Sequence, residues 1–598
     1  MNITKLSLTN FRSFGKTQTI DFASVTLLFG PNSVGKSSVL MALAYIHQIL
    51  LKGQCDPMKL EVLGDKYVGG FKRLVHGRDL SKSIIIKIEY SKAEVGHSYA
   101  YLMDIMGEQF DWHMRSASID AERAAIEVEV SWSEVANTAF VSRYTVWLDD
   151  EEVAELLSDS GMKQPIISKL NYFHPLLLPD NHEDWLIELM DGQYPTHPTL
   201  VEKAFSLKGI TLPTYRDISK GAEDIISDIE NDPDNLMTFT NEGFVSEFHE
   251  LLNSNVSILK EKNNASYLVE MMGGQYTFLH EPISFKGFVG ALPKLGKMIS
   301  TSKVFDDDKL NSIVNEILSD CLVAPLDNLL SVLNDGIFIG PLRTVPDLTY
   351  QANPYPQAKD WHNGLAAWDL LANADVKLLK LVDDWMSSKT KLDLGYGIAI
   401  KVEKKYAEFK AVKSVDSYSR AESQLNKMIL DSTEVPFKKV DFDERSTDYQ
   451  YSIWDKENHI DVSPNEIGVG VSQLLPFIVA VLSSRKGVVA IEQPELHVHP
   501  RVQVAIGDLL TQMNKQTNYL VETHSEHLIL RILKRISQTE AKELPKGYSG
   551  VNKEDISIVY LCPSECGVKA MRIGVDGEGE FTSKWPGGFF AERAEELF

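Results

Sequence analysis

The chain has 598 residues, 24% of them charged and 43% hydrophobic, which is an ordinary globular composition. Its 84 acidic residues outnumber the 60 basic ones. The formal charge of −24 argues against a protein that binds nucleic acid over its whole surface or is held to a membrane by charge. The longest apolar run, residues 474–482, is shorter than the roughly 20 residues of a membrane-spanning helix. Since the N-terminus also lacks the apolar core of a signal peptide, we predict a soluble, cytoplasmic protein.

The first predicted elements are strands and one helix. Residues 3–8 and 17–22 roughly alternate apolar and polar side chains, and residues 25–30 form a short apolar run that ends in glycine, so all three segments are predicted to be strands. A helix is predicted from Gly35 to about Leu51 and a further strand over 83–90.

Residues 91–334 differ from residues 1–90 in their predicted pattern of strands and helices. Strands are predicted over 98–105, 124–132 and 139–148, and a long, mostly helical stretch broken by proline and glycine follows them. No heptad pattern lasts long enough for a coiled coil, and the histidines show no metal-ligand spacing. We interpret the segment as one large, mixed and mainly helical insertion.

Buried strands alternate with helices again from residue 335 onward, which indicates an α/β fold. The simplest division is one α/β head, formed by residues 1–90 and 335–598, that is split by the insertion 91–334. The strands predicted in its second part cover 398–403, 488–492, 519–523 and 556–561, and the helices cover 471–485 and 500–514.

Residues 30–37, GPNSVGKS, match the pattern G-x-x-x-x-G-K-[ST] between an apolar strand and a helix, the context that this phosphate-binding motif requires. Gly30 and Gly35 allow the backbone to curl so that its N–H groups converge on phosphate oxygens, and the start of the helix adds partial positive charge. We expect Lys36 to bind the β- and γ-phosphates and the Ser37 hydroxyl to bind Mg²⁺. The alternative is a glycine-rich turn with an exposed lysine.

Two later strands end in residues that suit the same chemistry. The strand 488–492 ends at Glu492, whose carboxylate can meet a Mg²⁺ held by the phosphate loop. The strand 519–523 is followed by His524, which can hydrogen-bond a γ-phosphate or the attacking water. Taken alone, either residue is also compatible with a structural role.

A glycine-rich turn precedes the apolar helix that leads to the acidic strand. Residues 466–482, EIGVGVSQLLPFIVAVL, place Ser472 at the start of this helix, where small residues and a hydroxyl suit contact with an anion. Because the chain has its own phosphate loop, the second contact would serve the nucleotide of a neighbouring copy. A plain turn before a core helix remains the alternative.

In this order, the motifs GPNSVGKSS, GVGVSQ, VVAIEQPELHVHP and VETHSEH resemble the ABC-type ATPase heads of the RecF, SMC and OLD families. The opening LSLTNFRSFGKTQTIDF resembles their first strand pair. The segments FIGPLRTVP, IEQPELHVHP and FTSKWPGGFFAERAEELF resemble more narrowly the OLD-like AAA ATPases, which include subunits of anti-phage systems such as Septu and retrons. The resemblance covers about 1–90 and 335–598 and implies an ATP- and Mg²⁺-dependent head.

The resemblance also implies roles for individual residues. Glu492 would be the Walker B acid and a metal ligand with Ser37, His524 the switch histidine, and Gly470 and Ser472 the signature that acts on a partner's nucleotide. The remaining nucleotide-binding residues would be Arg12, Gly30, Pro31, Asn32, Ser33, Gly35, Lys36 and Ser38.

The chain departs from that pattern directly after the Walker B acid. ABC-type heads usually carry a catalytic glutamate there, and this chain has Gln493, which cannot act as a general base although it can orient water. Glu495 is a possible substitute two residues further along. We therefore expect slow hydrolysis and a nucleotide that works mainly as a conformational clamp.

No effector chemistry is recognised beside the ATPase motifs. Only about 70 residues follow His524, too few for the Toprim nuclease domain of OLD nucleases. Cys562 and Cys566 have no second pair of cysteines to complete a zinc site, which favours free thiols. With Cys55 and Cys321 the chain has four cysteines, too few for a disulfide framework in 598 residues.

These observations favour a sensor or scaffold subunit of an anti-phage defence complex. Its heads would form a homodimer or higher oligomer gated by ATP, and a partner protein such as a nuclease would supply the effector activity, with nucleic acid contacted only locally or through that partner. One alternative is a RecF- or SMC-like ATPase that clamps DNA during DNA maintenance. The other is a self-contained nuclease with an unrecognised active site in the insertion.

Overall fold

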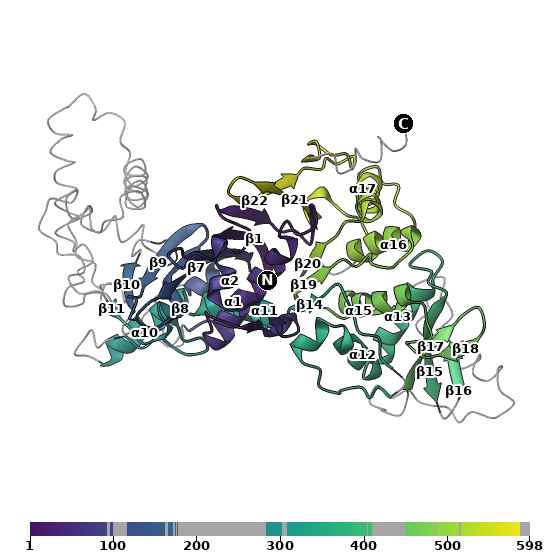
Figure 1. The fold of residues 1–598 in the computed structure, drawn as a ribbon, viewed down its shortest axis with the longest axis horizontal. Helices are drawn as coiled ribbons and strands as arrows, with labels where there is room; N and C mark the ends of the chain where they lie inside the picture. Colours follow the sequence, from purple (N-terminus) through teal and green to yellow (C-terminus); the bar gives the residue numbers. More distant parts are fainter. Residues whose placement is uncertain are drawn as a thin grey trace, which may run out of the picture. The chain divides into compact units, whose positions relative to one another are not determined.

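The computed structural model divides the chain into two compact units (Figure 1). Unit 1 comprises Met1–Gln48, Pro57–Asp79 and Ser331–Phe598, and unit 2 comprises Ile49–Asp56 and Leu80–Leu330. The predicted boundary at residue 90 therefore falls inside unit 2. The described residues are 1–92, 96–99, 116–161, 165–170, 174, 176, 283–301, 308–347, 349–402, 405–408, 450–484, 486–512 and 516–586.

Unit 1 is built on a six-stranded sheet, whose strands β19, β20 and β3 are buried at every position. The first five strands are parallel, and only the last runs antiparallel to its neighbour. Full burial explains why these strands appear in the sequence as continuous apolar runs. In spatial order the strands are β14 (Ile337–Ile339), β19 (Gly487–Glu492), β20 (Thr517–Glu522), β3 (Val25–Phe29), β21 (Ile556–Ser564) and β22 (Gly567–Ile573).

The parallel arrangement brings several strand ends to one edge of the sheet. Strand β20 lies between β19 and β3, and its last residue, Glu522, pairs in register with both Glu492 and Leu28. Ligands of open α/β sheets bind outside the carboxyl ends of the strands. This edge is therefore where a functional site is expected.

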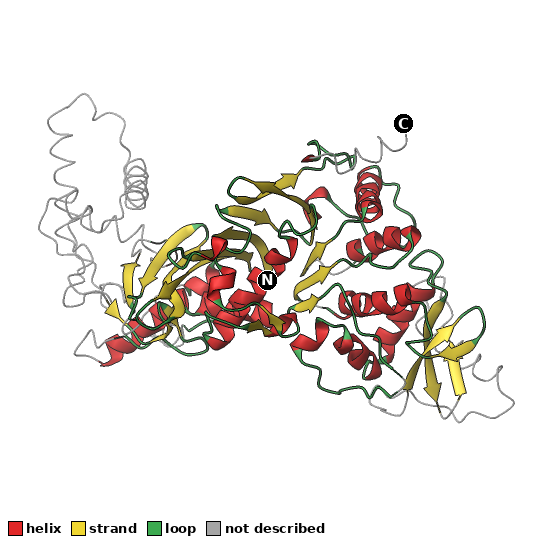
Figure 2. Ribbon diagram, in the orientation of Figure 1, coloured by secondary structure: helices red, strands yellow, loops and turns green. Residues whose placement is uncertain are grey.

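Helices connect and cover the strands of unit 1 (Figure 2). Helix α15 is buried at ten successive positions, Ser472–Val481, as expected for a helix that is apolar on all sides. The helices are α1 (Lys36–Lys52), α2 (Phe71–Leu74), α12 (Leu365–Ala372), α13 (Val376–Ser387), α15 (Val469–Ser483), α16 (Pro500–Thr511) and α17 (Glu526–Glu540), with 3₁₀ turns η1 (Glu61–Leu63), η2 (His76–Arg78), η5 (Ala358–Trp361) and η6 (Lys553–Asp555).

Smaller strand groups complete unit 1. A four-stranded antiparallel sheet contains β16 (Lys405–Glu408), β15 (Tyr396–Val402), β17 (Gln450–Asp455) and β18 (Ile460–Val462). Two hairpins pair β1 (Asn2–Thr9) with β2 (Gln18–Asp21) and β4 (Lys59–Leu60) with β5 (Lys66–Tyr67).

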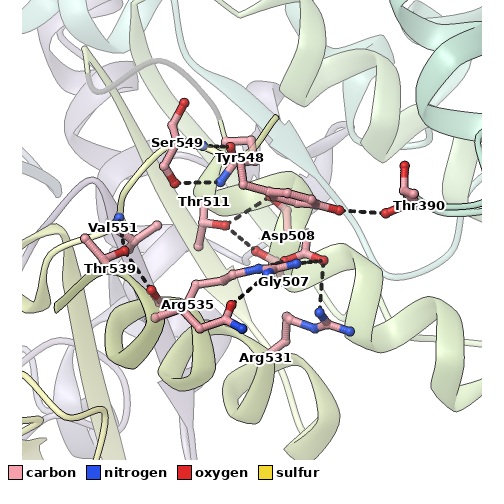
Figure 3. Close-up of polar contacts among 12 residues, drawn as sticks. Thr390, Gly507, Asp508, Thr511, Arg531, Arg535, Thr539, Tyr548, Ser549 and Val551 are labelled. Carbon is pink, nitrogen blue, oxygen red and sulfur yellow. Dashed lines mark hydrogen bonds and ion pairs between the residues drawn. The ribbon is translucent and has the colours of Figure 1, made fainter. Parts of the chain in front are cut away.

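A buried ion pair fixes α16 against α17 (Figure 3). The Asp508 carboxylate accepts hydrogen bonds from Nε and Nη2 of Arg535 at 2.6 and 3.1 Å, and Arg531 lies 3.5 Å away. The Arg535 guanidinium also stacks 4.1 Å from the ring centre of Tyr548, whose hydroxyl donates to the Thr390 carbonyl at 2.6 Å. These contacts hold together the helices that follow β19 and β20 in the chain.

The described part of unit 2 is mainly an antiparallel sheet with a few helices. Its strands run in the order β11 (Ile283–Ser284), β10 (Ile166–Leu170), β9 (Glu151–Leu157), β8 (Thr138–Leu148), β7 (Arg123–Ser133) and β6 (Ile84–Ser91), beside a hairpin of β12 (Gly287–Val289) and β13 (Leu292–Pro293). The helices are α4 (Ala117–Asp120), α10 (Asp308–Leu322) and α11 (Ala324–Asn334), the last of which extends into unit 1.

The structure confirms the α/β class and most of the predicted strands. Strands are present where 83–90, 124–132 and 139–148 predicted them, whereas the prediction over 98–105 falls mostly outside the described residues. Strands β9 to β13 were missed because they are short or carry charged residues at several positions. Among the described residues, no helix is long and apolar enough to span a membrane.

Candidate functional site

The loop between β3 and α1 has the curled backbone that its glycines predict. Gly30 and Gly35 have φ angles of 143° and 123°, in the region that favours glycine. A Cβ atom would lie 2.3 Å from the Leu561 carbonyl oxygen at Gly30 and 2.1 Å from Ser13 Oγ at Gly35. Both glycines are therefore required by conformation and by space.

The lysine of the loop is buried at the start of α1. Lys36 Nζ donates 3.0 Å hydrogen bonds to the carbonyl oxygens of Gly30 and Pro31, and it lies 3.8 Å from Glu522 Oε1. Burial lowers the pKa of Lys36, although Glu522 and Glu495 favour its charged form. The ammonium group thus lies inside the curl of the loop, beside the first N–H groups of a long helix.

The Ser37 hydroxyl lies between two carboxylates. Its Oγ is 2.7 Å from Glu522 Oε2 and 3.1 Å from Glu492 Oε2. A hydroxyl has a single proton, so it can donate to only one of the two carboxylates at a time. Burial, together with the neighbouring charges of Glu492 and Glu495, raises the pKa of Glu522.

This donor set fits Mg²⁺. The ion prefers hard oxygen ligands, usually one or two carboxylates with water and phosphate oxygens. Ser37, Glu492 and Glu522 supply one hydroxyl and two carboxylates, and a cation would relieve the repulsion between those carboxylates. The sequence had suggested Ser37 and Glu492, and Glu522 was missed although β20, like β19, ends in glutamate. No cluster of three or more metal-binding His, Cys, Asp or Glu side chains occurs in the described ranges.

A cavity of about 650 Å³ opens beside the loop, within the usual size range of ligand pockets. Five basic residues line it together with one acidic residue, so the cavity suits a highly charged anion. The lining residues are Arg12, Ser13, Ser33, Gly35, Lys36, Ser37, Ser38, Met41, Lys66, Arg73, Val75, Gly77, Arg78 and Glu522.

Lys36 belongs to the phosphate loop, and the other four basic residues come from two neighbouring segments of unit 1. The backbone N–H of Arg12 donates to the Leu74 carbonyl at 2.6 Å, and the Arg12 carbonyl oxygen lies 2.7 Å from Nδ1 of His76. These bonds tie residues 10–13, which include Arg12, to the segment that carries Arg73 and Arg78. Arg12 was predicted, whereas sequence reasoning missed Lys66, Arg73 and Arg78; the basic, glycine-containing run KYVGGFKRLVHGR at 66–78 was the signal available.

Glu495 and His524 meet close to the phosphate loop. Glu495 Oε1 accepts a 2.7 Å hydrogen bond from the His524 backbone N–H. The other carboxylate oxygen, Oε2, and the imidazole Nε2 are buried without a hydrogen-bond partner. Burial raises the pKa of Glu495 and lowers that of His524, which Lys36 lowers further. Two buried polar atoms here thus lack a hydrogen-bond partner, but neither residue lines the cavity, so their contact with a nucleotide or a water stays a prediction.

Gln493 has a strained backbone, with a φ angle of 47°. Its N–H donates to the Glu522 carbonyl at 2.8 Å, which ties the end of β19 to the end of β20. The backbone of Gln493 thus joins the ends of the two strands that carry the carboxylates, and the action of its amide on water stays a prediction.

The predicted signature residues lie at the start of α15. A Cβ atom at Gly470 would lie 2.4 Å from the His497 carbonyl oxygen, and the buried Ser472 hydroxyl donates to the Val469 carbonyl at 3.1 Å. Neither residue lines the cavity, so their action on a partner's nucleotide stays a prediction. Of the remaining predicted residues, Ser33 and Ser38 line the cavity, and Asn32 is exposed and does not.

Two family models match the chain. The model described as "AAA ATPase domain" matches residues 1–271, and the model described as "AAA domain, putative AbiEii toxin, Type IV TA system" matches residues 353–531. No curated protein matches the chain at a significant level.

Similar solved structures include the SMC head bound to the C-winged helix domain of ScpA, which is 10% identical with a TM-score of 0.35 and covers 96% of this chain and 98% of that chain. The SMC head domain of Thermotoga maritima is 9% identical with a TM-score of 0.32, covering 96% and 100%. RecF with ATPγS is 11% identical with a TM-score of 0.26, covering 95% and 98%. These similarities are low. The α/β P-loop ATPase fold rests on the strand order, the phosphate loop and the two ATPase models.

Proposed function

We propose that this chain binds Mg²⁺-ATP in the cavity beside the phosphate loop and hydrolyses it slowly, so that ATP works as a conformational clamp. One observation carries the proposal: the Ser37 hydroxyl lies between Glu492 and Glu522, directly beside the buried Lys36. The descriptions of the two matching family models, one an AAA ATPase domain and the other an AAA domain, support it.

Each part of the site has a role in this mechanism. Ser37, Glu492 and Glu522 would hold Mg²⁺, which supplies electrostatic stabilisation of the transferring phosphoryl group. Lys36 would exchange its bonds to loop carbonyls for bonds to the β- and γ-phosphates. The basic residues of the cavity would neutralise the remaining phosphate charge, and Arg12 is the nearest of them to the loop in sequence.

Slow hydrolysis follows from the residue after Glu492. Gln493 can orient water but cannot accept its proton. Glu495 is the remaining carboxylate with a free oxygen at this edge, and it also holds the His524 backbone. We therefore assign the general base to Glu495 and the contact with water or γ-phosphate to His524.

The substitution Glu495→Gln separates these two tasks. Glutamine keeps a carbonyl oxygen that accepts the His524 N–H bond, but it removes the base. We expect ATP binding to persist and turnover to fall by about 100-fold or more, the range of general-base catalysis. Turnover close to wild type in Glu495→Gln, with loss in Gln493→Ala, would instead assign water activation to Gln493. A wild-type rate of many turnovers per second that Gln493→Ala abolishes would contradict the slow clamp itself.

The clamp would form between two copies of the chain. Gly470 and Ser472 at the N-terminus of α15 would contact the nucleotide held by the partner's phosphate loop. Sedimentation should show self-association with Mg²⁺-ATP in the wild type and none in Lys36→Ala. Ser472→Ala should bind ATP and fail to associate. Association of Ser472→Ala equal to wild type would refute the signature role.

We further propose that the clamp controls a partner protein, such as a nuclease, in a cytoplasmic anti-phage defence complex. The description of the model matching residues 353–531, which names a putative toxin of a toxin–antitoxin system, supports this setting. Residues 91–334 would then offer the surface for the partner or the trigger. Purified chain should lack nuclease activity with Mg²⁺ or Mn²⁺, and a co-purified neighbouring gene product should restore it.

The alternative is a RecF- or SMC-like ATPase that clamps DNA. This alternative predicts that the chain binds DNA with an affinity that falls steeply as the salt concentration rises, because contacts with DNA phosphates release counterions. The basic lining of the cavity provides local positive charge, but that charge surrounds the phosphate loop. Strong, salt-dependent DNA binding in the absence of any partner would favour this alternative over the defence complex.

A further inference from the structure

A buried arginine joins three elements of unit 1. Arg343 follows β14, and only 4% of its surface is exposed. Its Nη2 donates to the Glu492 carbonyl oxygen at 2.8 Å, and its Nη1 donates to the Gln473 carbonyl oxygen at 3.2 Å. One guanidinium group therefore contacts both the end of β19 and the first turns of α15.

The backbone of Arg343 strengthens the link to α15. Its N–H donates to Gln473 Oε1 at 2.8 Å, and the Gln473 side-chain amide donates to the Arg343 carbonyl oxygen. The two residues thus exchange three polar contacts that tie β14 to α15. Because Gln473 directly follows Ser472, any displacement of this pair acts on the helix turn that carries the predicted signature.

Burying the charged Arg343 side chain is costly, and not all of its hydrogen-bond donors have a partner. Burial lowers the pKa of Arg343 to about 10, while Glu495 and Glu492 favour the charged form, so the group remains a cation at neutral pH. A guanidinium has five N–H donors, and here Nε is buried without a partner. A side chain kept only for packing would not need a charge at this position.

We propose that Arg343 is a positioning residue that couples the metal-binding end of β19 to the signature end of α15. If the Glu492 side chain moved to hold Mg²⁺, the backbone carbonyl oxygen of Glu492 would shift against the guanidinium of Arg343, and Arg343 would pass the shift to Gln473. Helix α15 is buried over Ser472–Val481, so a shift at Gln473 would be passed along the rigid helix to its first turn, which carries Gly470 and Ser472. This inference rests on the proposed function, because it describes how one site would report its occupancy to the other.

The experiment compares nucleotide binding with ATP-dependent self-association. Arg343→Lys keeps the positive charge but loses the planar guanidinium, and Arg343→Met removes both. Gln473→Met removes the two hydrogen bonds between the Gln473 side chain and the backbone of Arg343. Arg572→Met is the matched control, because Arg572 is an exposed arginine of unit 1 that pairs with Asp21 on the surface. All variants are assayed as the full chain for melting temperature, Mg²⁺-ATP affinity and self-association.

We expect Mg²⁺-ATP affinity near wild type in all three site variants and self-association weakened by about 10-fold or more, the size of a typical allosteric coupling. The double variant Arg343→Met/Gln473→Met should be no worse than either single variant, since both break one link. Equal losses of binding and association, additive losses in the double variant, or unchanged association would overturn the coupling.

Two further results keep the tests separate. If Arg343→Met does not fold, Gln473→Met tests the same link, because this variant keeps the guanidinium and its bonds to the backbone carbonyls of Gln473 and Glu492. If the wild type neither binds Mg²⁺-ATP nor associates, the proposed function fails and the coupling fails with it. If the wild type does both and the variants match it, the coupling alone fails.

Discussion

The substitution Glu522→Gln tests the two-carboxylate site with little change of shape. The Glu522 side chain is 7% exposed and lies 2.7 Å from Ser37 Oγ and 3.8 Å from Lys36 Nζ. Glutamine has the same size, and its carbonyl oxygen can still accept the Ser37 proton. The substitution therefore removes one negative charge from the site and leaves the packing in place.

The size of the effect follows from the distances. At an effective dielectric constant of about 20, two unit charges 4 Å apart interact by about 4 kcal/mol, and the burial of the carboxylate offsets part of this. We expect Mg²⁺-dependent ATP binding to weaken by about 1.5–3 kcal/mol, or roughly 10- to 150-fold. Without Mg²⁺ the sign reverses, because Glu522 then repels the phosphates, and the variant should bind ATP as well as wild type or better.

Titration of a fluorescent ATP analogue at several Mg²⁺ concentrations, and in EDTA, measures both effects. Glu543→Gln is the control, since Glu543 is exposed beyond the end of α17. If Glu522→Gln and wild type show the same Mg²⁺ dependence, Glu522 is not part of the metal site. A loss of ATP binding of equal size with and without Mg²⁺ would point to structural damage.

Three further predictions concern the loop and the scaffold. Gly35→Ala should abolish ATP binding, measured by the same titration, because its Cβ would lie 2.1 Å from Ser13 Oγ; retained binding would show that the loop can relax. Arg535→Met should lower the free energy of unfolding by about 3–5 kcal/mol in urea denaturation, because Asp508 stays buried and poorly paired. Arg531→Met should lower it by about 1 kcal/mol or less, and equal effects of the two substitutions would contradict this reasoning. Burial raises the pKa of Asp383 from 3.8 to about 6, so the folded state keeps a proton that the unfolded state releases. The stability of wild type relative to Asp383→Asn should therefore fall as pH rises from about 4 to about 6, by roughly 1.4 kcal/mol for each pH unit between the two pKa values, and a flat difference in thermal denaturation across that range would refute it.

Local sequence patterns predicted the parts of the site that short stretches of chain determine. The apolar run before Gly30 and the motif up to Ser37 predicted β3, the loop and α1, and the apolar runs ending at Glu492 and His524 predicted β19 and β20. The length of each apolar run, the neighbouring turn residues and the periodicity are enough to predict these elements, because each element is determined by a few consecutive residues.

The missed residues depend on long-range pairing instead. Glu522 joins the metal site because β20 lies between β19 and β3 in register, which no single strand reveals. Arg73 enters the cavity through the contact between the segment around Val75 and the first strand pair, where Phe11 and Val75 form an isolated bridge. Arg343 looks in the sequence like an ordinary polar residue after a strand, and only the packing of α15 shows its partners.

The distance along the chain between Ser37 and Glu522, 485 residues, has a consequence for synthesis. At about 5–20 residues per second, a ribosome needs roughly 25–100 s after making the phosphate loop to make its second carboxylate. Throughout that time the central sheet lacks β20, the neighbour that β3 requires on one side. A nascent chain thus carries the complete motif for phosphate binding long before it can hold the metal, so fragments cut short before residue 522 should be unable to enter the ATP-bound state.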